Sequence, residues 1–176
     1  VLVSILLLPL VMPVMILTAI AIKLDSAGPV FFRQERVGKW GRPFQCFKFR
    51  SMYVGADARK AELLHLNEAD GVVFKMKKDP RVTRVGRLIR KLSIDELPQI
   101  FNVIQGDMSL VGPRPPVPYE VAQYEFEHFR RLDATPGITG LQQVKGRSDI
   151  SFNSDRLELI KSKRHLASIG HRLRYG

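Results

Sequence analysis

The 176-residue sequence is poor in the residues that build covalent or zinc-based frameworks, since it contains one cysteine, Cys46, and four histidines. A single cysteine excludes an internal disulfide, and with it the small secreted scaffolds that depend on disulfides. The same counts disfavour a zinc centre made from cysteine and histidine clusters. The sequence also lacks the internal repeats that build solenoids.

Acidic residues are scarce as well. The chain has 17 Asp and Glu against 28 Lys and Arg, which gives a net charge of +11 and a pI near 10.2. Because 45% of the residues are hydrophobic, the chain is not a disordered basic tail. Such a chain must face nucleic acid, phospholipid headgroups or a phosphorylated substrate. No nucleic-acid recognition motif accompanies the charge, so a nucleic-acid binder is the weakest of these interpretations.

The first 22 residues carry no charge at all, and 18 of them are hydrophobic. At about 1.5 Å per residue, a helix of this length would just cross the roughly 30 Å core of a bilayer. Pro9 and Pro13 each remove a backbone donor and predict a kink. A kinked spanning helix and a re-entrant helix-break-helix, which returns to the same face, both fit the segment. The basic sequence that follows predicts a cytoplasmic location for the remainder in either case.

Residues 23–152 predict an α+β domain, mostly helical, with a short β-hairpin. Two aromatic runs, 29–32 and 44–49, bracket the turn-rich stretch 38–43, which is the pattern of a hairpin. Residues 82–92 place apolar and basic side chains on opposite sides of a helix. Residues 153–176 form a basic tail for which no structure is predicted.

A helix is expected from Ser93 to Gly106, since Gly106 is a good terminator and apolar side chains recur on one face: Ile94, Leu97, Ile100, Phe101 and Ile104. Ser93 and Glu96 match a capping box, which puts Asp95 and Glu96 in the first turn. Acidic residues there often serve only as caps. Two adjacent carboxylates can also bind a hard divalent cation or supply an oxygen nucleophile.

Cationic side chains surround this pair in the sequence. Residues 75–91 contain eight Lys or Arg and one acid, and Arg90 lies five residues before Asp95. Arg114 is held between prolines, which suits bidentate recognition of a phosphate. A glycine-containing run over 136–147 ends in Arg147, and its glycines could let backbone amides approach an anion. Structural turns and solvated charges are the alternatives for both runs.

Several ordered motifs in residues 1–152 resemble the bacterial sugar transferases, the monotopic polyprenyl-phosphate phosphoglycosyltransferases. The strings that carry the resemblance are Lys48-Phe49-Arg50-Ser51-Met52, Asp79-Pro80-Arg81-Val82-Thr83, Gly86-Arg87-Leu88-Ile89-Arg90-Lys91, Ser93-Ile94-Asp95-Glu96-Leu97-Pro98-Gln99, Gly106-Asp107-Met108-Ser109-Leu110-Val111-Gly112-Pro113-Arg114-Pro115 and Pro136-Gly137-Ile138-Thr139-Gly140. The resemblance implies transfer of a hexose 1-phosphate from a UDP-sugar to undecaprenyl phosphate with release of UMP. It also implies re-entry for residues 1–22.

The resemblance assigns roles to the candidate residues. Asp95 matches the nucleophile that forms an aspartyl-phosphosugar intermediate. Glu96 matches its partner, and the two carboxylates would hold Mg²⁺ against the diphosphate. Arg90, Arg114 and Arg147 match positions around the phosphates, and Lys48 is a further candidate for phosphate binding.

The resemblance further implies an enzyme at the cytoplasmic face of the bacterial inner membrane, which starts exopolysaccharide, capsule or O-antigen lipopolysaccharide synthesis. Its partners would be the UDP-sugar, undecaprenyl phosphate and membrane lipid, with a homodimer left open. Because 153–176 lacks the family's aromatic-rich ending, a catalytically inactive basic membrane-surface scaffold is the alternative. The chain begins without Met, so we expect it to be part of a longer protein.

Overall fold

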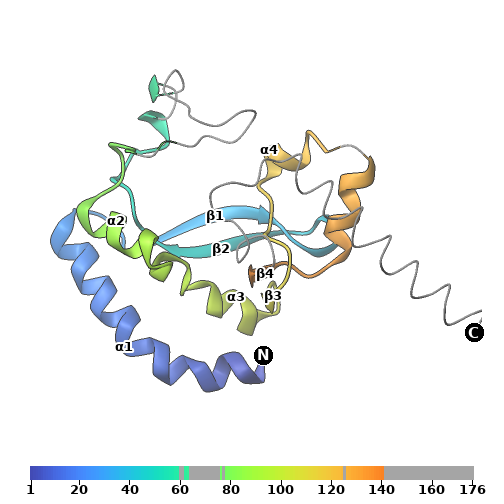
Figure 1. Ribbon diagram of the computed structural model, residues 1–176, viewed down its shortest axis with the longest axis horizontal. Coiled ribbons are helices and arrows are strands. Elements are labelled where there is room, and N and C mark those ends of the chain that lie inside the picture. The colour runs from blue at the N-terminus through green and yellow to red at the C-terminus, as the bar shows by residue number, and fades with distance from the viewer. Residues whose placement is uncertain (60–61, 64–75, 77, 125, 141–176) are drawn as a thin grey trace, which may run out of the picture. The chain divides into compact units, whose positions relative to one another are not determined.

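The computed structural model describes residues 1–59, 62–63, 76, 78–124 and 126–140, which form an α+β unit as predicted (Figure 1). Its helices and 3-10 turns are, in chain order, α1 (Leu2–Asp25), η1 (Lys39–Gly41), α2 (Arg84–Lys91), η3 (Ile94–Glu96), α3 (Gln99–Gln105), α4 (Pro118–Val121) and η4 (Phe126–Asp133). Its strands are β1 (Phe31–Val37), β2 (Pro43–Phe49), β3 (Ser109–Val111) and β4 (Gly137–Thr139).

Helix α1 contains both Pro9 and Pro13, and its ribbon curves along its length in Figure 1. Its buried side chains are Ser4, Met15, Thr18 and Ile22. Most of its other apolar side chains face outward, and Leu6 is 79% exposed. Within the described residues, α1 is the one helix long and apolar enough to cross a membrane, judged by length and composition alone. Whether it spans or re-enters stays a prediction.

The C-terminal end of α1 is tied to the rest of the unit by polar contacts. Asp25 Oδ2 accepts a hydrogen bond from the backbone N–H of Val85 at 3.0 Å, which joins α1 to α2. The buried guanidinium of Arg50 donates to the carbonyls of Ser26, at 2.7 Å, and of Ala27. These bonds satisfy carbonyl groups at the helix end, so Arg50 acts as a side-chain cap from the chain after β2.

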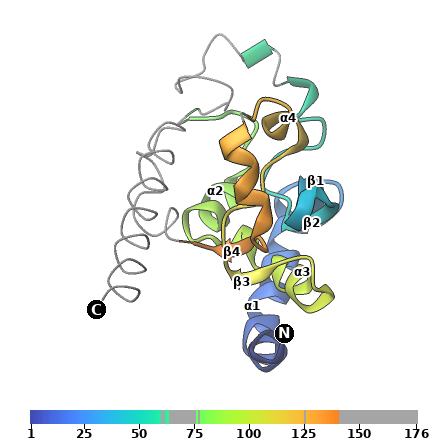
Figure 2. The same ribbon diagram turned by 90° about the vertical axis from the view of Figure 1, so that its right-hand side faces the viewer.

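Strands β1 and β2 pair in antiparallel fashion with Gln34 opposite Cys46, and η1 makes the turn between them, which confirms the predicted hairpin. Side chains alternate along each strand, so one face of the hairpin, the Gln34 face, carries Phe32, Gln34 and Arg36 with their partners Lys48, Cys46 and Phe44. Figures 1 and 2 show α3 between this hairpin and α1.

Asn102 joins α3 to the open edge of the hairpin. Its amide oxygen accepts from Phe47 N at 3.0 Å and its amide nitrogen donates to Gln45 O at 2.8 Å. The side chain is 0% exposed, so it satisfies strand-edge groups that water does not reach. Asn102 thus takes the place of a third strand at this point of β2.

Two apolar clusters fill the spaces around the hairpin. The first joins α1, α2 and β2 through Met15, Ile22, Phe49 and Ile89, with Ile94, Leu97 and Phe101 packed against it. The second contains Cys46, Val103 and Met108, with Phe44, Leu110 and Ile138 against it. Burying these side chains supplies the main driving force that holds the elements in place.

The predicted single helix after Ser93 is instead a 3-10 turn, η3, followed by α3. Ser93 adopts the left-handed conformation at φ +62° and makes no side-chain cap, so the predicted capping box is wrong. Pro98 also has no N–H to donate into a continuous helix. The predicted terminator is confirmed, because Gly106 ends α3 at φ +89°.

The parallel pair β3–β4 brings two glycines into backbone contact. A Cβ on Gly137 would lie 2.1 Å from Gly112 N, and one on Gly112 would lie 2.5 Å from Thr135 O. The N–H of Gly137 donates to Pro113 O at 2.9 Å, so this amide serves the fold. The structural interpretation of the predicted glycine run therefore applies at Gly137.

Candidate active site

A cavity of about 420 Å³ lies beside the hairpin, near the end of α2 and the start of η3. The hairpin contributes Gln34, Lys48 and three phenylalanines, and the chain after β2 contributes residues 50–57. Arg90 from α2 and Asp95 from η3 complete the wall. The cavity thus places two carboxylates, Asp57 and Asp95, among three cations, Lys48, Arg50 and Arg90, and the excess of cations suits an anionic ligand.

The apolar part of the wall is aromatic. Phe31 and Phe49 stack with ring centroids 5.4 Å apart and an interplanar angle of 16°. Phe32 and Tyr53 also line the cavity, and both rings are partly exposed. Aromatic faces of this kind pack well against flat ring systems.

The two adjacent carboxylates predicted from the sequence lie in η3 and point to different neighbours. Asp95 lines the cavity. Glu96 Oε1 accepts from Lys48 Nζ at 2.9 Å, and the two side chains are 19% and 18% exposed. Lys48 therefore contacts Glu96 and also lines the cavity beside Asp95.

Arg90 stands between the first cavity and a second of about 570 Å³, and lines both. The second cavity is also lined by Lys78, Arg87 and Lys91. Four of the eight cations noted in residues 75–91 therefore line the second cavity. Helix α2 is fixed there by Thr83, whose hydroxyl accepts from Gly86 N at 2.9 Å and caps the helix.

The remaining predicted arginines lie elsewhere. Arg114 lines neither of these two cavities and lies on the loop between β3 and α4, near the far end of the Gln34 face. Arg147 lies outside the described residues. The structure therefore brings together Lys48, Arg90, Asp95 and, through its ion pair, Glu96.

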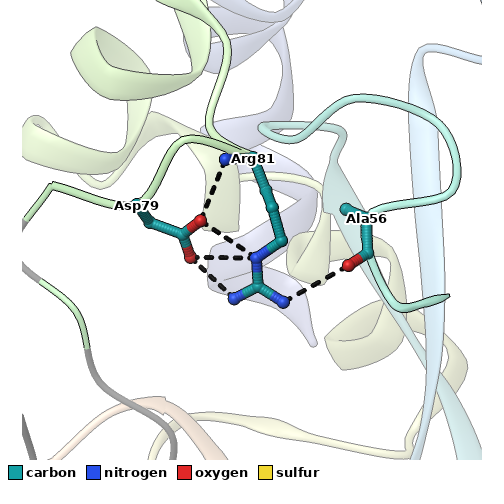
Figure 3. A network of polar contacts seen from close by, with 3 residues as sticks. All are labelled: Ala56, Asp79 and Arg81. Carbon is teal, nitrogen blue, oxygen red and sulfur yellow. Dashed lines mark hydrogen bonds and ion pairs between the residues drawn. The ribbon is translucent and has the colours of Figure 1, made fainter. Parts of the chain in front are cut away.

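Sequence reasoning missed an ion pair that supports the cavity wall (Figure 3). The guanidinium of Arg81 makes contacts of 2.6 to 3.2 Å with the Asp79 carboxylate, which also accepts from Arg81 N at 2.9 Å. Arg81 Nη1 donates to Ala56 O at 3.3 Å, and Tyr53 N donates to Arg81 O at 2.9 Å. Both side chains are buried, so the pair fixes the loop that lines the cavity.

Arg50 was likewise not predicted as a site residue, although it lines the cavity and caps α1. Gly28 explains how it fits, because a Cβ there would lie 2.3 Å from Arg50 Nη1 and the backbone φ is +121°. The available signal for this contact in the sequence was Gly28, a glycine just after the apolar segment. Its partner lies more than twenty residues away, which local pattern reading cannot pair.

The residues present also bear on cysteine-based and metal-based chemistry. Burial raises the pKa of the Cys46 thiol, which disfavours the thiolate that a cysteine nucleophile needs. Among the described residues, no group of three or more His, Cys, Asp or Glu forms a metal site. Mg²⁺ often uses one or two carboxylates together with substrate phosphates, so Asp95 in the cavity wall suits that ion, whereas Glu96 would have to exchange its contact with Lys48 to reach it.

The first cavity thus combines aromatic side chains with three cations and two carboxylates, a lining that suits a phosphorylated ligand. The same unit carries an apolar helix, α1, with an exposed surface. A family model described as bacterial sugar transferase matches residues 1–163. The chain therefore belongs to the bacterial sugar transferase family, which confirms the resemblance noted in its motifs.

Three curated relatives are similar to this chain. It is 53% identical over 136 residues to the galactosyl transferase CpsE of Streptococcus agalactiae, with 77% of this chain and 30% of that protein covered. It is 46% identical over 158 residues to the undecaprenyl-phosphate galactose phosphotransferase of Salmonella typhimurium, with 86% and 32% covered. It is 48% identical over 149 residues to the undecaprenyl-phosphate glucose phosphotransferase of Komagataeibacter xylinus, with 81% and 26% covered. The chain thus spans a third or less of the length of these relatives.

Proposed function

We propose that this chain transfers a hexose 1-phosphate from a UDP-sugar to undecaprenyl phosphate and releases UMP. The observation that carries the proposal is Asp95, a carboxylate in a cavity wall that also contains Lys48 and Arg90. Family membership and the names of the relatives support the reaction class. The names differ in the sugar, so galactose and glucose are both candidates.

In the first step a carboxylate oxygen of Asp95 attacks the phosphorus bonded to the sugar. The bond between that phosphorus and the bridging oxygen breaks, and UMP leaves with the electron pair. The sugar phosphate is now joined to Asp95 as an acyl phosphate. In the second step a phosphate oxygen of undecaprenyl phosphate attacks the same phosphorus, the bond to Asp95 breaks, and the carboxylate is restored.

An anionic nucleophile must approach an anionic diphosphate, so the surrounding cations decide whether attack is feasible. Arg90 and Lys48 line the cavity with Asp95 and would offset the phosphate charge. Asp95 and Glu96 would hold Mg²⁺, which supplies further charge neutralisation on the diphosphate when bound. We assign Arg114 and Arg147 to the phosphates as well, on the basis of the family motifs.

The aromatic part of the wall provides a place for the neutral portions of the donor. Phe32 and Tyr53 offer partly exposed rings beside Lys48 and Arg90, so a uracil or sugar ring can pack there while its phosphates face the cations. This arrangement is consistent with a donor that has one planar ring and two phosphates.

The lipid acceptor requires a membrane, and the exposed apolar surface of α1 would supply the contact. We propose that α1 re-enters the cytoplasmic leaflet of the bacterial inner membrane, with the catalytic residues on the cytoplasmic face. Single cysteines before Val1 and at Lys39, in a variant that lacks Cys46, should then both be labelled from the cytoplasm only. Periplasmic labelling of the N-terminal cysteine would establish a spanning helix instead.

Release of UMP tests the function directly. The full chain in membranes is incubated with Mg²⁺, undecaprenyl phosphate and a panel of UDP-hexoses, and UMP is measured for each donor. We expect release with at least one donor, its loss in Asp95→Asn, and wild-type rates in Asp133→Asn, an exposed carboxylate outside the cavity. Absence of UMP with every donor would favour the inactive membrane-surface scaffold.

A further inference from the structure

The loop that carries Arg114 is held almost entirely through its carbonyl groups. Residues 113, 115 and 116 are prolines, so they have no N–H to donate. Four consecutive carbonyls accept hydrogen bonds from three other elements: Pro113 O from Gly137 N at 2.9 Å, Arg114 O from Arg131 Nη2 at 3.2 Å, Pro115 O from Arg36 Nη1 at 2.9 Å and Pro116 O from Val37 N at 2.9 Å.

Arg36 differs from the other donors because it is a buried charged side chain. It is 7% exposed, whereas the Arg131 contact lies at the surface. Its Nη2 donates to Gln34 Oε1 at 2.6 Å, and Gln34 lines the first cavity. One guanidinium therefore joins the cavity wall to the carbonyl that directly follows Arg114.

Arg36 lies near Arg114, because it bonds the carbonyl of the next residue, Pro115. Burial lowers the pKa of Arg36, and the nearby charge of Arg114 lowers it further. Two cations placed together repel each other, so the fold bears a cost that the hydrogen bonds of Arg36 and the nearby charge of Glu120 offset. A neutral side chain would avoid this cost. The presence of an arginine therefore indicates that its planar fork, which bonds Pro115 O and Gln34 Oε1, is needed at this position.

We propose that Arg36 is a positioning residue, which fixes Arg114 relative to the Gln34 face so that its guanidinium can meet a phosphate of the substrate. The inference rests on the proposed function through the role of Arg114. Arg36 would act by holding the loop in place through hydrogen bonds. The two ends of the Arg36 fork bond Pro115 O and Gln34 Oε1, and Val37 N beside it bonds Pro116 O, so the loop is clamped to β1.

The clamp can be measured without any substrate. Arg36→Lys keeps the charge but loses the planar fork, so amide hydrogen exchange at Val37, whose N–H donates to Pro116 O, and over residues 109–117 should speed up by roughly tenfold or more. Arg33→Lys is the matched control, since Arg33 lies on the same strand but faces the ring of Phe47. Unchanged exchange in Arg36→Lys would overturn the proposal.

A double-mutant cycle tests whether Arg36 acts through Arg114. We expect Arg36→Lys and Arg114→Lys each to lower kcat/KM for UMP release by roughly tenfold, and the double variant to lose little more than Arg114→Lys alone. Losses that multiply would show that Arg36 supports the fold in general, and would contradict the proposal. Arg33→Lys should leave kcat/KM unchanged in both backgrounds.

The proposal can still be tested if Arg36→Lys does not fold or if the wild type releases no UMP. Should Arg36→Lys fail to fold, Gln34→Leu takes its place, because it removes only the acceptor of Arg36 Nη2. The same exchange measurement is then made on this variant. Faster exchange over 109–117 supports the clamp, and unchanged exchange overturns it. Should the wild type release no UMP from any donor, the proposed function fails, and exchange in Arg36→Lys still decides whether the clamp exists.

Discussion

The cavity wall and the Arg114 loop both present cations, but they are held in different ways. The wall formed by residues 53–57 depends on a buried side-chain ion pair, Asp79–Arg81, that reaches Ala56 O. The loop around Arg114 depends on main-chain carbonyls and on the close contact of Gly112 with Gly137. The first region is therefore sensitive to charge and pH, and the second to backbone shape.

The largest effect on the cavity side should follow from Asp79→Asn. The substitution leaves Arg81 buried beside a neutral amide, and removal of one partner of a buried pair costs about 3 kcal/mol of unfolding free energy. Thermal or denaturant unfolding of both proteins in the same detergent measures the difference. Glu35→Gln is the control, since this acid is exposed on β1. Equal stability for Asp79→Asn and wild type would show that the pair does not support the wall.

The same pair predicts a pH dependence. Hydrogen bonds from Arg81 lower the pKa of Asp79, so the ionised carboxylate stabilises the folded state. This stabilisation is complete above the unfolded pKa of about 4 and is lost as the pH falls through the lower folded value. The difference in stability between wild type and Asp79→Asn should therefore be constant near neutral pH and shrink below about pH 4. A difference that grows with acid would contradict this assignment.

On the loop side, Gly137→Ala should lower the free energy of unfolding by about 2 kcal/mol, because the new methyl group would overlap backbone atoms of Gly112 and not a movable side chain. The loss should not depend on pH, in contrast to Asp79→Asn. Gly41→Ala makes a useful comparison, because a Cβ at Gly41 meets no atom within 4 Å and only its φ of +77° opposes the change. A smaller loss for Gly137→Ala than for Gly41→Ala would rule out the backbone contact as the cause.

A smaller effect on stability, but a clear one on turnover, is expected from Arg114→Lys. Arg114 contributes its carbonyl to a bond from Arg131, which a lysine at this position keeps, so the free energy of unfolding should change little. The loss of the planar fork should lower kcat/KM for UMP release by roughly tenfold. Arg84→Lys on α2, an exposed arginine that lines neither cavity, is the control. Equal rates for the two variants would identify Arg114 as a loop residue without a role in binding.

Parts of this arrangement could be predicted because their signals are local. The turn-rich stretch between two aromatic runs predicted the hairpin, and Gly106 predicted the end of α3. The motif strings predicted the family, which the comparison confirms. Each of these signals occupies a short stretch of sequence, where spacing alone is informative.

Other parts could not be predicted because the partners are far apart in the chain. Lys48 and Glu96 are separated by 48 residues, and Arg36 and Pro115 by 79. The capping box failed because Ser93 takes a left-handed conformation and Glu96 bonds to Lys48, a tertiary contact that overrides a local pattern. The three-residue strands β3 and β4 are too short to leave a periodic signal.

The most direct test of the account is the mass of the intact protein after incubation with a UDP-sugar and Mg²⁺ in the absence of undecaprenyl phosphate. A covalent intermediate at Asp95 predicts an added hexose phosphate in the wild type, its removal when undecaprenyl phosphate is supplied, and no adduct in Asp95→Asn. An adduct that persists in Asp95→Asn would place the nucleophile elsewhere. Normal UMP release with no adduct at any time would contradict the two-step mechanism.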